Sequence, residues 1–146
     1  MKSFFLDKFE YDYFSNLKWI ETLTEYEDAL NPFILKSFSH LVNVHHRWIS
    51  RMIDQPSESD SWDLLPIDYW TALCQDNYRK TIDYLEHLEL NEKVNYHSEE
   101  GVKMTKDAID ILYHILNHSN YHRAQISREM RILGITPPSF NFIAFR

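Results

Sequence analysis

Four long stretches of the chain repeat apolar side chains every three or four residues, the spacing of one face of an α-helix. They run from about Ser3 to Ala29, from Asn31-Pro32 to about Ile53, from near Pro66 to Glu89, and from near Thr105 to Gly134. Proline suits the first turn of a helix and glycine its end, so Pro32 and Gly134 mark helix boundaries. We therefore predict an all-α four-helix bundle.

The connection before the fourth helix has a different pattern. Residues 94–96 and 102–104 flank a polar turn, residues 97–101, which predicts a small hairpin. Thr105 is the predicted N-cap of the fourth helix. The tail after Gly134 is predicted to be extended and to pack its apolar end against the bundle through Phe140, Phe142, Ile143 and Phe145.

Composition limits the class of protein. A chain of 146 residues has the size of one domain, so we predict that residues 1–146 form a single unit. The net charge is -7 and no Lys/Arg cluster is present, which disfavours nucleic-acid binding. The chain has no apolar run of membrane-spanning length, no secretory signal at its start, and one cysteine, Cys74. These features predict a cytoplasmic protein without a membrane or disulfide.

His118 and His122 are four residues apart, which places them one above the other on the same side of a helix. Apolar residues on the same face, among them Ile115 and Ile126, indicate that both rings lie towards the core. A shared divalent metal ion would satisfy both lone pairs. The alternative is a pair of core histidines bonded to neighbouring helices or to water, because this spacing also arises by chance. A zincin site is excluded, since Ser119 stands where the catalytic glutamate is required.

A third metal ligand must come from another helix. In the second helix His40 and His45 flank the apolar face, and periodicity does not choose between them. His46 is predicted to point away from that face into solvent. His114, one turn before His118, is predicted to have a supporting or structural role. Cys74 is predicted to be a small buried residue without thiolate reactivity.

Several segments resemble the DinB/YfiT-like metal-binding bundles. Residues 116–126 read Leu-Asn-His-Ser-Asn-Tyr-His-Arg-Ala-Gln-Ile, similar to that family's N-H-x-x-x-H-R-G-Q-I signature. Residues 9–16, residues 40–51 with their His, Trp and Arg, and residues 137–143 also resemble the family's patterns. The resemblance implies a three-histidine metal site made by His40, His118 and His122. Two positions depart from the pattern, Ala124 for glycine and Asp12 for asparagine, and the second departure makes Asp12 a candidate to face the metal.

The resemblance also suggests an activity. Three neutral imidazoles leave a metal ion with an open position, and some family members transfer low-molecular-weight thiols to electrophiles. The first hypothesis is thus a metal-dependent thiol S-transferase that uses a small thiol cosubstrate and a divalent ion, zinc or nickel by preference. The alternatives are a metal-dependent hydrolase, with Asp12 or Glu129 as the base, and a non-catalytic metal-binding stress-response protein. A homodimer is expected by analogy.

Overall fold

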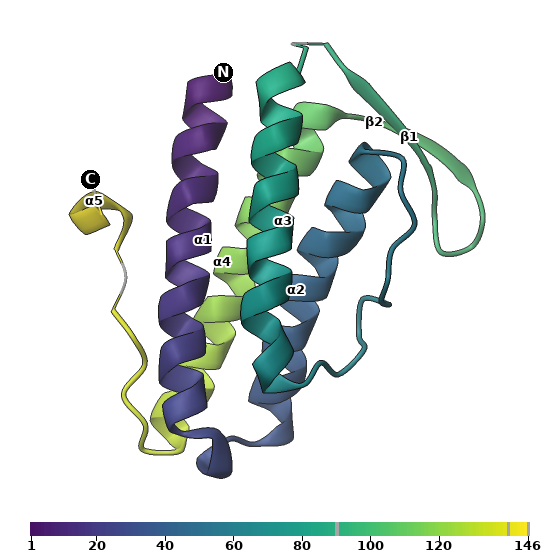
Figure 1. The fold of residues 1–146 in the computed structure, drawn as a ribbon. Helices are drawn as coiled ribbons and strands as arrows, with labels where there is room; N and C mark the ends of the chain where they lie inside the picture. The colour runs from purple at the N-terminus through teal and green to yellow at the C-terminus, as the bar shows by residue number, and fades with distance from the viewer. Residues whose placement is uncertain (90, 140, 146) are drawn as a thin grey trace.

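The structure is a computed structural model that describes residues 1–89, 91–139 and 141–145. It is mostly helical, with a two-stranded antiparallel sheet (Figure 1). In chain order the elements are α1 (Lys2–Glu25), the 3₁₀ turn η1 (Glu27–Ala29), α2 (Pro32–Met52), α3 (Ile67–His87), β1 (Lys93–His97), β2 (Lys103–Asp107), α4 (Ala108–Ile132) and α5 (Phe142–Phe145). The predicted class of fold, a helical bundle, is confirmed. The described residues form five α-helices and not four, because the tail contains the single turn α5.

The long helices lie side by side, and the hairpin leaves one end of the bundle and extends along its outside on the α2 side (Figure 1). α1 packs mainly against α3, and α2 packs against both α3 and α4. The connection from α2 to α3, residues 53–66, runs along the outside of α2 (Figure 1). We call this segment the α2–α3 loop. No helix within the described ranges has both the length and the apolar character needed to cross a membrane.

Local signals set the ends of α2 and α4. The Asn31 side chain accepts a hydrogen bond from the Ile34 backbone N–H, and Pro32 opens the helix, as predicted. At the end of α4, Gly134 has a φ of +77°. The Ile135 N–H bonds the Met130 carbonyl and the Gly134 N–H bonds the Arg131 carbonyl, the hydrogen-bond pair of a Schellman motif. The predicted glycine stop is confirmed.

The predicted start of α4 at Thr105 is wrong. Thr105 lies in β2 and faces Asn95, whose side chain accepts a hydrogen bond from the Thr105 hydroxyl. The strand pairing continues to Lys93 and Asp107, which keeps the backbone extended up to the first residue of α4. The hairpin itself is confirmed, with β1 and β2 joined by residues 98–102. α1 is also shorter than predicted, because η1 replaces its last turn.

The apolar tail packs on α1 as predicted. The Tyr11 ring meets the rings of Phe142 and Phe145 edge-on, with centroids 5.2 and 5.7 Å apart. Ile143 differs, since it is exposed. Phe140, which was assigned to the same contact, lies outside the described residues.

The bundle core consists of two apolar clusters separated by a layer of buried polar residues. One cluster includes Leu23, Phe38 and Ile126, and the other includes Phe9, Leu85 and Ile115. Between them along the helices lie buried polar side chains from all four long helices, which we call the polar layer. Its members are Asp12, Ser15, Asn16, Asn43, His45, His46, Asn77, Thr81, Ser119, His122 and Arg123. This layer positions the histidines discussed next.

Candidate metal centre

Three histidines from two packed helices meet at the edge of the polar layer. His40 lies on α2, and His118 and His122 lie one turn apart on α4. The ring centroids are 4.9 Å apart for His40 and His118, 4.7 Å for His40 and His122, and 4.4 Å for His118 and His122. Each ring offers a nitrogen within 4.8 Å of the others, so the three can hold one metal ion. Among the described residues this is the only such group of histidine, cysteine or acidic side chains. We call it the histidine triad.

The hydrogen bonds around the triad leave ring nitrogens available to a metal ion. His40 Nδ1 lies 2.7 Å from the Ser61 carbonyl oxygen, so Nδ1 donates, and Nε2 of the neutral ring carries a lone pair. That Nε2 lies 3.1 Å from His118 Nε2. His122 Nδ1 is buried and has no hydrogen-bond partner in the described part of the chain. A bound cation fits these nitrogens, and metal-ligating histidines commonly donate their other ring N–H to a carbonyl, as His40 does.

Burial keeps the triad in the form that binds metal. Desolvation, reinforced by the neighbouring His122 and His40, lowers the pKa of His118 to about 3. Desolvation and the charge of His40 lower the pKa of His122 to about 4. Desolvation also lowers the pKa of His40, partly offset by the bond to Ser61. All three rings are therefore neutral at pH 7, the protonation state of a metal ligand.

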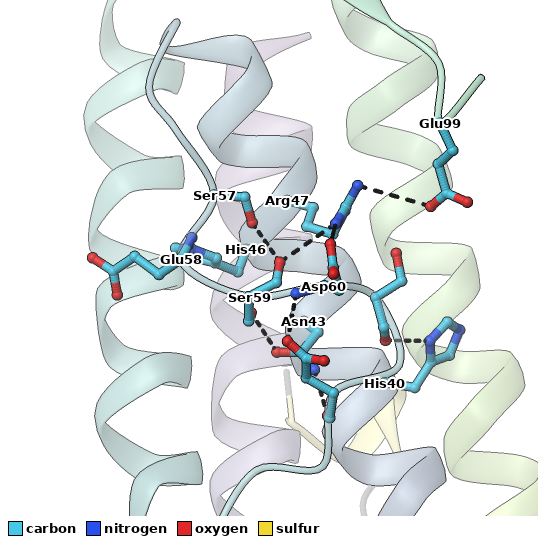
Figure 2. A network of polar contacts seen from close by, with 11 residues as sticks. His40, Asn43, His46, Arg47, Ser57, Glu58, Ser59, Asp60 and Glu99 are labelled. Carbon is cyan, nitrogen blue, oxygen red and sulfur yellow. Dashed lines mark hydrogen bonds and ion pairs between the residues drawn. The ribbon is translucent and has the colours of Figure 1, made fainter. Parts of the chain in front are cut away.

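The α2–α3 loop holds the outer side of the triad through contacts with α2 (Figure 2). Besides the Ser61 carbonyl, which accepts from His40, the Asp63 carbonyl accepts from the Asn43 amide at 2.9 Å. The Ser59 hydroxyl donates to the Asn43 side-chain oxygen at 2.8 Å. These bonds fix the loop beside His40 on both sides of residue 62. The carbonyl that orients His40 is thus itself held in place.

Arg47 extends this network to the hairpin. Its guanidinium pairs with Asp60 of the α2–α3 loop at 2.6 Å and approaches Glu99 of the hairpin turn at 3.8 Å (Figure 2). Sequence reasoning missed these contacts. The available signal was the row of polar residues on α2, Ser39, Asn43, His46 and Arg47, at helical spacing and opposite a polar loop.

The prediction that His46 is solvated is wrong. Only 1% of its surface is exposed. Its Nδ1 lies 3.3 Å from the Asn77 side-chain oxygen, and its Nε2 accepts from the Glu58 backbone N–H at 3.1 Å. The α2–α3 loop covers this side of α2, which periodicity within the helix cannot reveal.

His45, the alternative third ligand, lies elsewhere in the polar layer. Its Nε2 lies 2.9 Å from the Thr81 hydroxyl, and its ring packs on Phe9. Burial lowers the pKa of His45 to about 4. His114 is exposed, and its ring lies between Trp48 and His118, outside the triad. Cys74 is buried as predicted, and desolvation raises the pKa of its thiol.

Neither carboxylate suggested as a base lies free at the triad. Asp12 accepts from Arg123 at 2.7 Å and from Asn16 at 3.2 Å, inside the bundle. Its proposed position facing the metal is therefore wrong, since Arg123 on α4 pairs with it instead. Glu129 accepts from the Asn31 side chain at 2.7 Å, at the start of α2. The Asp12–Arg123 pair was not predicted, because its partners are 111 residues apart.

The fold and the triad together define a class of protein, a helical bundle with three histidines from two helices arranged to hold a metal ion. Within that class the chain belongs to the DinB family, whose sequence model matches residues 14–146. The resemblance drawn from the motifs is thereby confirmed. A search of the curated proteins gives no match.

Proposed function

We propose that this DinB-family protein binds a divalent metal ion through His40, His118 and His122 and uses it to transfer a low-molecular-weight thiol to an electrophile. The observation that supports the proposal is the composition of the site. Three neutral imidazoles converge, and among the described residues no carboxylate or thiol joins their group. An imidazole donor set suits zinc and nickel.

The residues of the chain have separable roles in this proposal. A divalent ion held by three neutral imidazoles supplies a positive centre with an open position, which favours the thiolate form of a bound thiol. His40 is oriented by its bond to Ser61, so Nε2 faces His118. Burial of His118 and His122 keeps their lone pairs available at neutral pH. The polar layer fixes α2 to α3 through His45 and Thr81, and α4 to α1 through Arg123 and Asp12.

The nucleophile has to come from the cosubstrate. Cys74 is the only cysteine of the sequence, and it lies in the apolar core with Leu73 and Trp70. In the reaction the thiol gives its proton to solvent and its sulfur forms a bond to the electrophilic carbon. The leaving group departs with the electrons of the bond that breaks. The atoms balance without an oxidant or reductant.

Hydrolysis has less support from the contacts of the site. A hydrolase needs a group that removes a proton from water, and Asp12 and Glu129 are each bonded to another side chain away from the triad. The third alternative, a metal-binding protein without catalytic activity, requires only the three histidines and no base or cosubstrate. A homodimer, a cytoplasmic location and a stress-response role stay predictions.

Thiol consumption tests the proposal. Zinc- or nickel-loaded protein should accelerate the loss of a chromogenic electrophile only when a small thiol is present, and His122→Ala should abolish the acceleration. His87→Ala is the matched control, because His87 is exposed at the end of α3, with its Nδ1 3.0 Å from the Asp83 carbonyl oxygen of the same helix. Ester or amide cleavage without added thiol would show that the protein is a hydrolase and not a thiol transferase. Metal binding without either reaction would leave a non-catalytic protein.

A further inference from the structure

An exposed tryptophan stands against the histidine triad. The Trp62 ring stacks on the ring of His40 with centroids 3.5 Å apart and planes 9° from parallel. It also meets the ring of His122 at 6.5 Å, almost perpendicular. Yet 64% of the Trp62 surface is exposed. The indole is larger than the imidazole on which it stacks, so part of it extends past His40 at the edge of the triad, where it also meets His122.

The backbone on both sides of Trp62 is fixed. The Ser61 carbonyl accepts from His40 and the Asp63 carbonyl accepts from Asn43, both on α2. The Asp63 carboxylate also accepts from the Asp60 backbone N–H at 2.8 Å. The indole is therefore held in place before any ligand arrives, and a ligand that packs on it loses little loop entropy.

A second exposed aromatic ring lies against His122 of the triad. Tyr121 on α4 is 59% exposed, and its ring meets that of His122 edge-on at 5.2 Å. Two rings from different segments thus border the triad, one against His40 and one against His122. Aromatic side chains around a few convergent polar groups are typical of sites for small organic ligands.

We propose that Trp62 is a stacking platform for the substrate, which selects a ligand that joins a metal-binding group to a flat aromatic group. This inference rests on the proposed metal site and specifies its substrate class. The part of the indole that extends past the His40 ring offers dispersion contact and burial of apolar surface to a flat group, while the open metal position takes the polar end. Tyr121 contributes less, because it meets His122 edge-on.

Two probes with the same metal-binding group distinguish the contribution of Trp62 to ligand affinity from that of the metal. Acetohydroxamic acid and benzohydroxamic acid carry identical hydroxamates and differ in a methyl or a phenyl group. Calorimetric titration of the zinc-loaded protein should give benzohydroxamate an affinity about tenfold higher than acetohydroxamate, the size of one aromatic stacking contact. Trp62→Ala should remove that preference and leave acetohydroxamate affinity and zinc content unchanged. Trp62→Phe should retain part of the preference.

Tyr113→Ala is the matched control. Tyr113 is 62% exposed but lines another surface, a cavity of about 220 Å³ with Phe4 and Phe142. This variant should keep the full preference for benzohydroxamate.

Three results would overturn the platform. Equal affinity for the two hydroxamates in the unmodified protein would do so while leaving the metal site intact. Loss of zinc from Trp62→Ala would show that Trp62 supports His40 instead of contacting the ligand. A protein that holds no zinc and binds neither hydroxamate would overturn the proposed metal site as well, and so identifies which of the two inferences has failed.

Discussion

Two groups of histidines lie close together in the bundle and differ in how their nitrogens are used. His45 and His46 on α2 are buried. His45 Nε2 lies within hydrogen-bonding distance of Thr81, and the two nitrogens of His46 lie within that distance of Asn77 and the Glu58 backbone. In the histidine triad, by contrast, His40 and His118 direct nitrogens towards each other. His122 leaves a buried nitrogen without a partner among the described residues.

The comparison separates a structural histidine from a candidate ligand. A buried histidine whose nitrogens have neutral partners adds to the packing of the bundle and needs nothing further. Rings with low pKa values that face one another gain from a cation, because one cation can take a lone pair from all three rings at once. The two kinds differ in position, since His45 and His46 lie within the polar layer, whereas the triad lies at its edge beside the exposed Trp62.

The largest expected effect is on the stability of the fold, through the buried ion pair of Asp12 and Arg123 in the polar layer. Arg123→Met should lower the free energy of unfolding by about 3–5 kcal/mol, because it leaves the buried Asp12 carboxylate without its cation. Urea denaturation at pH 7 measures the change. The control Arg128→Met, at an exposed position of α4, should change stability by less than about 0.5 kcal/mol. An unchanged midpoint in Arg123→Met would contradict the structural role of the pair.

The second prediction concerns pH and the paired histidine His45. Its pKa is about 4 in the folded protein and near 6.5 when unfolded, so between these values the unfolded chain binds more protons. Stability from this residue is complete above pH 6.5 and falls by about 3 kcal/mol as the pH drops through this range to 4. Urea denaturation of metal-free protein at pH 7 and pH 4.5 should show a smaller pH dependence for His45→Gln than for the unmodified chain. An equal pH dependence of stability in the two proteins would contradict the lowered pKa of His45.

The third prediction concerns zinc binding by the histidine triad. His122→Ala should weaken zinc affinity by about a hundredfold or more, since it removes a ligand and not an outer partner. Competition with a chromogenic chelator measures the affinity. His45→Gln is the comparison variant, and it should keep the zinc affinity within about threefold while losing stability. If both variants lost zinc equally, the distinction between the two groups of histidines would fail.

The smallest effect is expected where the α2–α3 loop supports the triad. Asn43→Ala removes the bonds to Ser59 and Asp63 and should loosen the carbonyl that orients His40. Zinc affinity should fall about tenfold, the lower end of the effect of outer partners on metal sites. Ser57→Ala is the control, because its exposed hydroxyl bonds only the Ser59 carbonyl within the loop. If Ser57→Ala lowered zinc affinity as much as Asn43→Ala, the bonds of Asn43 to the loop would not be what orients His40.

Many features were determined by the sequence itself, because their causes are local. The apolar spacing predicted the long helices, Pro32 and Gly134 marked helix ends, and the polar turn around Gly101 predicted the hairpin. The four-residue spacing of His118 and His122 likewise placed two imidazoles on one side of α4. Each of these follows from backbone geometry within a few residues.

Contacts between distant segments were decided only by the tertiary structure. Periodicity left His40 and His45 equal, and the family resemblance favoured His40. The fold brings His40 to α4 and points His45 at Thr81. The burial of His46, the pairing of Asp12 with Arg123 and the stacking of Trp62 on His40 also join residues far apart in the sequence. A helical period describes one helix in isolation, whereas the loop or helix that covers each of its sides is set by the packing of the whole chain.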